Sequence, residues 1–148
     1  DFLRFLRAEL IPFVEARFRA DPGQRAILGA ALGGLFSLYV LFHEPELFSR
    51  YLTLSPSLWW DDNVTLEYER RFAAREEALP VRLFLSVGLD EPKTMIRDLK
   101  KLAATLHSRH YTGLRLRVLQ IRGGTHQSAQ PTAITQGLLF GFSSTDIK

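Results

Sequence analysis

Cysteine is absent from this chain of 148 residues. Its absence excludes a disulfide framework and a thiolate metal site. It is compatible with either redox compartment, so the location stays open, with the cytoplasm favoured. The sequence also has no apolar run of roughly 20 residues that would span a membrane, and no basic and apolar signal segment at its start. We therefore expect no association with a membrane.

A concentrated basic surface is also lacking, although the formal net charge is +3 and the sequence pI is about 9.5. Basic and acidic residues alternate, as in Tyr68-Glu69-Arg70-Arg71 and Arg75-Glu76-Glu77. No basic cluster is interleaved with aromatic residues, so nucleic-acid binding is not favoured. The histidines are scattered, which argues against a zinc site. We expect neither a metal nor a cofactor.

The composition is that of a folded domain, with 46% apolar residues, eleven Phe and two Trp. A chain of this length suits one domain with a sizeable core, and we expect a single domain over residues 1–148. Asp1 is followed at once by Phe2 and Leu3 of a helical pattern. This abrupt opening leads us to expect that an upstream part of the fold is missing.

Apolar spacing predicts helices and strands in strict alternation. Helices are expected at 2–19, with a kink or a new start at Pro12, and at 32–42, about 64–78, 93–109 and about 131–140. Strands are expected at 25–28, which we interpret as buried, and at 51–55, 81–87 and 114–121. Asp61-Asp62-Asn63 offers capping side chains, and the polar tail after Phe142 is expected to be frayed. The alternation predicts an α/β fold with parallel strands and right-handed helical crossovers.

The loop after the first strand reads Gly29-Ala30-Ala31-Leu32-Gly33-Gly34. In open parallel sheets, ligands bind beyond the carboxyl ends of the strands, where this loop lies. Small residues two before and two after position 31 match the nucleophile elbow, G-x-S-x-G, with Ala31 in the serine position. There the helix N-terminus stabilises an anion. Such a turn also suits close packing alone or a phosphate, but no lysine follows Gly34 as in a P-loop.

Two later loops carry an acid and a base. Asp90 and Glu91 follow the third strand, and His126 follows the last strand in a Gly-Gly-Thr-His loop. Acidic loop residues and surface histidines are common, so each is weak evidence alone. Together they follow the nucleophile position in the order nucleophile, acid, base, which is the order of α/β-hydrolases. The remaining histidines are interpreted as surface residues: His43, His107 and His110.

With these features the chain resembles the putative-esterase group of α/β-hydrolases. That group includes bacterial siderophore trilactone esterases and, more distantly, S-formylglutathione hydrolases. Four segments carry the resemblance: RAILGAALGGLF at 25–36, LSPSLWW at 54–60, LSVGLDE at 85–91 and GTHQSAQP at 124–131. The resemblance implies a three-layer α/β-hydrolase-type parallel sheet flanked by helices. It also implies that this chain is the C-terminal part of the fold, which would expose a sheet edge or pair it with an upstream half or another chain.

The resemblance assigns roles to the elbow and to the two later loops. The family elbow typically reads G-H-S-L-G-G, so Ala31 stands at the nucleophile position and Ala30 at the usual histidine. Leu32 would give a backbone N–H to the oxyanion hole. His126 matches the general base, while Glu91 matches the acid best, with Asp90 as the nearby alternative. Ser55, Trp59 and Trp60 are expected to line or support the substrate pocket, although core and turn roles suit them equally.

Two functions follow from this resemblance. The first is a serine carboxylic-ester hydrolase scaffold for a small-molecule ester or lactone, inactive because the methyl group of Ala31 cannot attack a carbonyl. The alternative is a natural non-catalytic homologue that binds a ligand or a partner. The adjacent alanines Ala30 and Ala31 favour drift, whereas the retained His126 and acidic loop favour recent catalysis. The codon at position 31 in the source gene separates the two.

Overall fold

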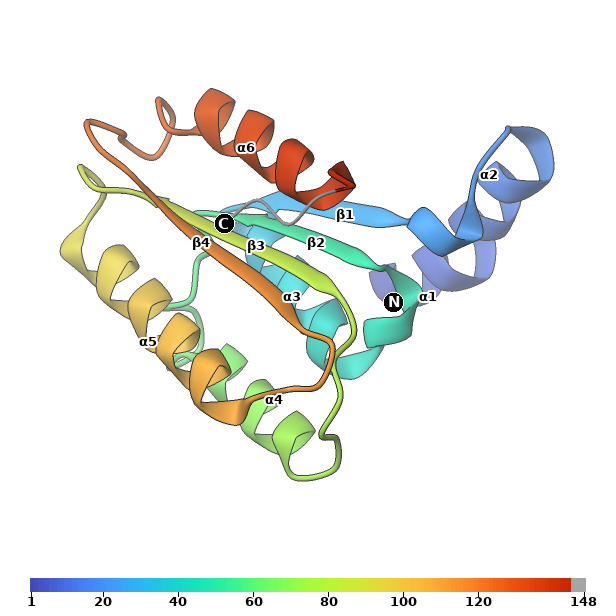
Figure 1. Ribbon diagram of the computed structural model, residues 1–148, viewed down its shortest axis with the longest axis horizontal. Coiled ribbons are helices and arrows are strands. Elements are labelled where there is room, and N and C mark those ends of the chain that lie inside the picture. The colour runs from blue at the N-terminus through green and yellow to red at the C-terminus, as the bar shows by residue number, and fades with distance from the viewer. Residues whose placement is uncertain (145–148) are drawn as a thin grey trace.

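The computed structural model describes residues 1–144 and shows one parallel sheet. Its strands are β1 (Ala26–Ala30), β2 (Arg50–Leu54), β3 (Arg82–Gly88) and β4 (Arg115–Ile121). They are hydrogen-bonded in the order β1-β2-β3-β4, all in parallel (Figure 1). Because all the strands are parallel, all four carboxyl ends open at one edge of the sheet. The frayed end expected after Phe142 lies outside the described residues from position 145 onward.

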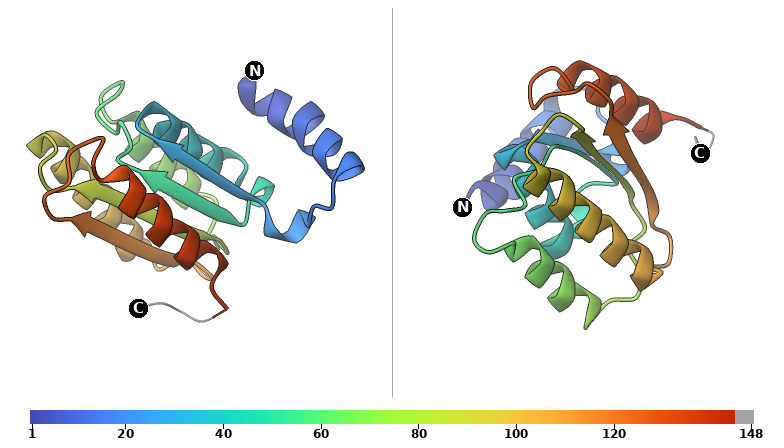
Figure 2. Two further views of the ribbon diagram at one scale, coloured as in Figure 1. Left: turned by 90° about the horizontal axis from the view of Figure 1, so that it is seen from above. Right: turned by 90° about the vertical axis from the view of Figure 1, so that its left-hand side faces the viewer.

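Helices cover both faces of the sheet, which confirms the predicted three-layer α/β arrangement. One face carries α6 (Gln130–Phe142), and the other carries α3 (Leu32–His43), α4 (Val64–Ala73) and α5 (Lys93–Arg109) (Figure 1). The N-terminal helices lie at the side of the sheet that ends in β1 (Figure 2). They comprise α1 (Phe2–Phe5), a π-helical turn (Leu6–Leu10) and α2 (Ile11–Arg17). Short 3₁₀ turns occur at Pro22–Gln24 and Pro45–Leu47.

The alternation of side chains along β3 explains why this strand is buried on both faces. Leu83 and Leu85 belong to the core beneath α3 and α5, whereas Phe84 packs on the opposite side against α6. All three are fully buried. Each such side chain stabilises the fold by roughly 1.5–3 kcal/mol through transfer from water. Consequently the middle strands are fixed between the two helical layers, and the loops at their carboxyl ends begin from this core.

Arginines from two neighbouring strands hold the C-terminus of α6. Arg50 and Arg82 are paired in the sheet register. Arg50 Nε donates to the carbonyl of Gly141 at 2.6 Å, and an Arg82 Nη donates to the carbonyl of Ser143 at 2.6 Å. The last carbonyls of a helix have no intrahelical partner, so these bonds replace the usual glycine cap. They fix α6 at the end opposite to the loop that carries His126.

Two expectations about the beginning of the chain need correction. The helical segment predicted for 2–19 ends at Arg17. Of the two alternatives at Pro12, the new start is confirmed, because α2 begins at Ile11 with Pro12 in its first turn and follows the π-helical turn that ends at Leu10. Proline has no N–H and its ring crowds the preceding turn, which favours the wider turn at that point. The first strand is not buried: β1 is an edge strand and Leu28 is 43% exposed.

The predicted cap of α4 is also wrong. Asp61, Asp62 and Asn63 all have positive φ, between 48° and 59°, and Asn63 makes no side-chain cap bond. The start of the helix is capped by backbone instead of by a side chain: Leu66 N donates to the carbonyl of Asn63 at 2.9 Å. The helix ends at Ala73 rather than about 78.

A buried ionic cluster ties α4 to the end of α5. The side chain of Glu69 is 1% exposed and accepts hydrogen bonds from Arg109 at 2.8 and 2.9 Å. It also accepts one from the Tyr111 hydroxyl at 2.8 Å. Burial and the hydrogen bond to Glu69 raise the pKa of Tyr111 above its usual range. A buried carboxylate is stable only with such partners, so the cluster depends on all three groups.

We expect Glu69→Gln to lower the free energy of unfolding by about 2–3 kcal/mol, because the amide keeps the volume but loses the charge-assisted bonds. The measurement is urea denaturation followed by tryptophan fluorescence. Glu67→Gln on the same helix is the matched control. Hydrogen bonds from Arg70 and Arg71 lower the pKa of Glu67 to about 2, but this group is exposed, and solvent screening should leave stability nearly unchanged. Equal losses in the two variants would contradict the role of the buried cluster.

Candidate active site

A single residue connects β1 to α3. Ala31 has φ 53° and ψ −116°, which is strained backbone for a residue other than glycine. Ala31 N donates to the carbonyl of Leu54 at 3.0 Å, and its own carbonyl accepts from Ser57 N at 3.0 Å. Backbone in such a region costs on the order of 1–3 kcal/mol and persists only where the surroundings impose it. Here the loop after β2 imposes it.

Close contact between glycines makes this sharp turn possible. A Cβ on Gly29 would lie 2.1 Å from the carbonyl oxygen of Gly33, and one on Gly34 would lie 3.1 Å from Pro56 Cα. A Cβ on Gly33 would meet nothing within 4 Å. Gly29 and Gly34 therefore let α3 start directly at the end of β1 and pack against the loop after β2. The predicted sharp strand-to-helix turn is present, with position 31 at its apex.

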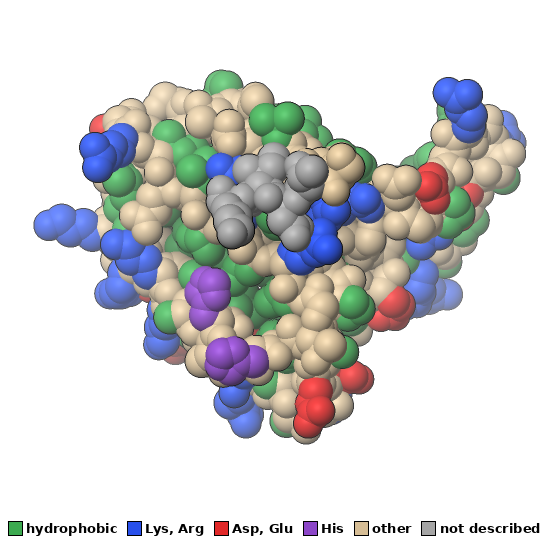
Figure 3. Space-filling view, in the orientation of Figure 1, with side chains coloured by type: hydrophobic (Ala, Val, Ile, Leu, Met, Phe, Trp, Pro, Cys, Tyr) green, Lys and Arg blue, Asp and Glu red, His purple; other side chains and the backbone are tan. Residues whose placement is uncertain are grey.

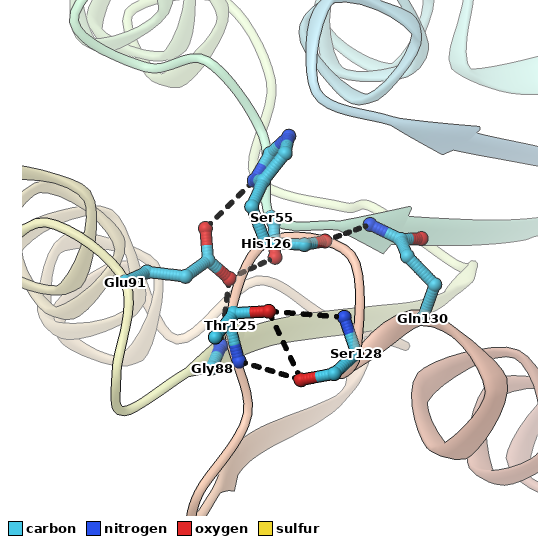
Figure 4. Close-up of polar contacts among 7 residues, drawn as sticks. All are labelled: Ser55, Gly88, Glu91, Thr125, His126, Ser128 and Gln130. Carbon is cyan, nitrogen blue, oxygen red and sulfur yellow. Dashed lines mark hydrogen bonds and ion pairs between the residues drawn. The ribbon is translucent and has the colours of Figure 1, made fainter.

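The carboxylate of Glu91 joins three loops. Its side chain is fully buried. Its Oε2 lies 2.8 Å from His126 Nδ1, while Oε1 accepts from Gly88 N at 2.8 Å and from Ser55 Oγ at 2.5 Å (Figure 4). Because an ionised carboxylate only accepts, Nδ1 of the imidazole carries the proton, and Nε2 of the neutral ring is an acceptor. This is the tautomer that a general base requires.

The loop that carries His126 is fixed on both sides. Gln130 Nε2 donates to the carbonyl of His126 at 3.0 Å, and Thr125 N donates to Ser128 Oγ at 2.9 Å (Figure 4). A Cβ on Gly88 would lie 2.0 Å from the carbonyl oxygen of Gly124, so the loops after β3 and β4 are in direct backbone contact. The imidazole is 37% exposed and is therefore accessible while its carboxylate partner is not.

The structure separates the two acidic candidates. Asp90 is exposed, and its backbone N–H donates to the carbonyl of Gly124 at 3.0 Å. It is Glu91, one residue later, that reaches His126. The bond from Ser55 to Glu91 was not foreseen from the sequence, because the two residues are 36 positions apart and no local pattern marks the pair.

Two of the remaining candidates, Leu32 and Trp60, line an open hollow beside the turn. Trp59 and Trp60 are about half exposed and meet edge to face. Trp60 and Leu32 line the hollow, which has a volume of about 230 Å³. Ala30 is half-buried at the end of β1. The other lining residues come from α3, α4 and the loop before α4: Leu35, Phe36, Tyr39, Asp61, Val64 and Tyr68. Ser55 is only 2% exposed, so it supports the site from beneath.

On the face drawn in Figure 3, Lys and Arg side chains stand along the left edge, near the middle and at the right. Among residues 1–144, no group of three or more His, Asp or Glu side chains is arranged to hold a metal ion. None of the helices described is both long and apolar enough to cross a membrane.

Comparison with known proteins gives the family. A family model described as "Putative esterase" matches residues 1–127. The chain belongs to this family of α/β-hydrolases. The match includes the turn at Ala31, Glu91 and His126. The fold and the family on which the sequence analysis settled are therefore confirmed.

Several proteins that are similar to the chain are siderophore esterases by name. Ferri-bacillibactin esterase BesA of Bacillus subtilis is 29% identical over 144 residues, which are 94% of this chain and 50% of that protein. A siderophore enterobactin esterase of Emericella nidulans is 42% identical over 97 residues, covering 62% of this chain and 32% of that protein. The crystal structure of the BES protein from Bacillus cereus superposes with a TM-score of 0.87 at 32% identity. The superposition covers 95% of this chain and 53% of the BES protein. The chain thus spans about half the length of these relatives, or less.

We expect Gly29→Ala to lower the free energy of unfolding by about 3 kcal/mol, because the added methyl would collide with backbone that no rotamer change can move. Gly33→Ala is the matched control at the other end of the contact. Its methyl meets open space, so stability should hold or rise by up to about 1 kcal/mol from the better helix propensity. Chemical denaturation of both variants measures the difference. A Gly29→Ala variant as stable as the parent would show that the close contact is not required.

Proposed function

We propose that this chain carries the base and the acid of a serine-type carboxylic-ester hydrolase whose nucleophile position is occupied by Ala31, so that it does not turn over esters as it stands. The observation that carries the proposal is the bond between Glu91 and His126 at the sheet edge where Ala31 forms a strained turn. A buried carboxylate that orients an exposed imidazole is the arrangement that activates a hydroxyl nucleophile.

Each group has a chemical role in this proposal. With serine at position 31, Nε2 of His126 would take the hydroxyl proton as oxygen attacks the ester carbonyl, and Glu91 would stabilise the imidazolium. The N–H of Leu32, the first residue of α3, would donate to the oxyanion that forms, and the helix dipole would add to this effect. In this fold the second oxyanion donor comes from a loop earlier than the nucleophile strand. The methyl group of Ala31 has no proton to give and no lone pair to attack with.

The proposed substrate class is a small-molecule ester or lactone of the kind that siderophore esterases act on. The support is the family and the names of the relatives, ferri-bacillibactin esterase and siderophore enterobactin esterase. The hollow lined by Leu32 and Trp60 adjoins the proposed oxyanion donor, so one end of such a molecule would be held there. Aromatic and apolar lining with few polar groups is typical of small-molecule sites.

A second candidate function is ligand binding without catalysis. The strained backbone at Ala31 favours it, because the turn keeps its geometry although no nucleophile is left to benefit from it. On this view the intact hollow beside Trp60 and the imidazole of His126 hold an ester without cleaving it. Isothermal titration with a catecholate triester would then show binding to the parent chain, and chromatography would recover the ester intact.

We expect Ala31→Ser to raise the hydrolysis of p-nitrophenyl acetate by about 100-fold or more over the parent, because loss of one triad member typically removes several orders of magnitude in rate. The measurement uses the full-length product of the gene. The same variant should be labelled by a fluorophosphonate, which reacts only with an activated hydroxyl.

The control for this experiment is Ala31→Ser combined with His126→Ala, which keeps the hydroxyl but removes the base. Labelling and hydrolysis should both fall to the level of the parent. If Ala31→Ser itself gains neither hydrolysis nor labelling, the proposal of a dormant esterase site is refuted. Labelling that persists without His126 would refute the role given to the imidazole.

A further inference from the structure

Ser55 makes a hydrogen bond to the acid, Glu91, that the proposed roles of Glu91 and His126 do not account for. Its hydroxyl lies 2.5 Å from Oε1 of Glu91 and is 36 residues away in sequence. The residue is 2% exposed, so the hydroxyl faces the carboxylate rather than solvent. Since the carboxylate only accepts, the hydroxyl donates. Hydrogen bonds to a charged acceptor are the stronger kind, at roughly 1.5–3 kcal/mol.

The backbone of Ser55 is bent so that this contact can form. Ser55 N donates to the carbonyl of Ser86 at 2.8 Å, which extends the pairing of β2 with β3 by one residue. The φ angle is 42°, in the left-handed region, and Pro56 follows. Along β2 side chains point alternately to the two faces of the sheet, but this turn sends the Ser55 side chain across the strand ends to Glu91 (Figure 4). Strain of this kind in a residue other than glycine persists only where the surrounding structure imposes it.

We propose that Ser55 is a positioning residue for the acid of the site. Together with Gly88 N–H it immobilises Oε1 of Glu91, so that Oε2 is presented to Nδ1 of His126. Two donors on one oxygen prevent rotation of the carboxylate about its terminal bond. With Gly88 N–H alone, Oε2 would swing away from the imidazole, and the Nδ1–H tautomer would lose its preference. The catalytic consequence rests on the proposed function, whereas the effect on the imidazole does not.

Ser55 is not a replacement for the missing nucleophile. Its hydroxyl bonds to the acid and lies on the Nδ1 side of the base, as Figure 4 shows. A nucleophile must give its proton to Nε2, the other ring nitrogen. Burial at 2% exposure also removes it from any ester in the hollow. Activity gained by Ala31→Ser therefore tests position 31 and not Ser55.

The first test requires no activity. Ring ¹⁵N shifts of His126, measured by NMR in the chain with Ala31 at a pH where the imidazole is neutral, report which nitrogen carries the proton. We expect the Nδ1–H tautomer to predominate in the parent. In Ser55→Ala and Ser55→Gly it should give way to a mixture with Nε2–H. Glycine removes the hydroxyl and also relieves the positive φ, so the two variants differ in backbone strain but share the loss of the donor.

The matched control is Ser37→Ala. Ser37 is a second fully buried serine, whose hydroxyl bonds to the carbonyl of Gly34 and to Thr53 Oγ1 away from Glu91. Its removal should lower the melting temperature but leave the tautomer of His126 unchanged. Retention of the parent tautomer in Ser55→Ala and Ser55→Gly would overturn the proposal. A tautomer change in Ser55→Ala but not in Ser55→Gly would also overturn it. Both variants lack the hydroxyl, so the change would then come from the strained backbone that only the alanine variant keeps.

The second test adds activity. With Ala31→Ser as the background, Ser55→Ala should lower kcat by about tenfold or more and leave KM nearly unchanged, because the acid acts in the transition state and does not contact substrate. A change in KM alone would overturn the positioning role. If the Ala31→Ser background shows no esterase activity, the proposed function fails, and the NMR result still decides the role of Ser55.

Discussion

The buried carboxylate of Glu91 is the interaction on which the rest of the site depends. A charge enclosed by protein is stable only when donors surround it. Here the donors come from three loops: Ser55 after β2, Gly88 at the end of β3 and His126 after β4. The loop after β1 joins the same network through the bond from Ser57 N to the carbonyl of Ala31. The carboxylate thus links the carboxyl ends of β2, β3 and β4, and the turn after β1 is joined to the loop after β2 by backbone bonds.

Strain at this edge accompanies that network. Ala31 and Ser55 both have positive φ, although neither is glycine. Residues held in such regions cluster at functional sites, where surrounding structure imposes the conformation. A glycine at position 31 would relieve the strain, yet the chain keeps a side chain there, at the apex of the turn. In the proposed function, this turn and the Glu91–His126 pair are the parts that would orient a hydroxyl at position 31.

The fold was largely predictable because its signals are local. The apolar spacing of α5 and the continuous apolar run of β3 depend on neighbouring residues, and both elements lie close to where they were expected. The errors arose where tertiary contacts outweigh local preference. Asn63 looks like a cap but adopts a left-handed turn, and Leu28 looks buried but is exposed on β1, the outermost strand of the described sheet. The helix α4 ends at Ala73, earlier than the predicted residue 78, because its end depends on tertiary contacts that the local sequence pattern does not indicate.

The sequence by itself determined the order of the site residues along the chain and the family, since motifs around Ala31, Glu91 and His126 occur at the ends of predicted strands. The resemblance favoured Glu91 as the acid and kept Asp90 as the nearby alternative. Only the tertiary structure showed that Glu91 contacts His126 and that Ser55 bonds to its other oxygen. The physical reason is that adjacent residues in a loop have similar local signals but point in different directions. Parallel pairing of strands far apart in sequence decides which one meets the imidazole.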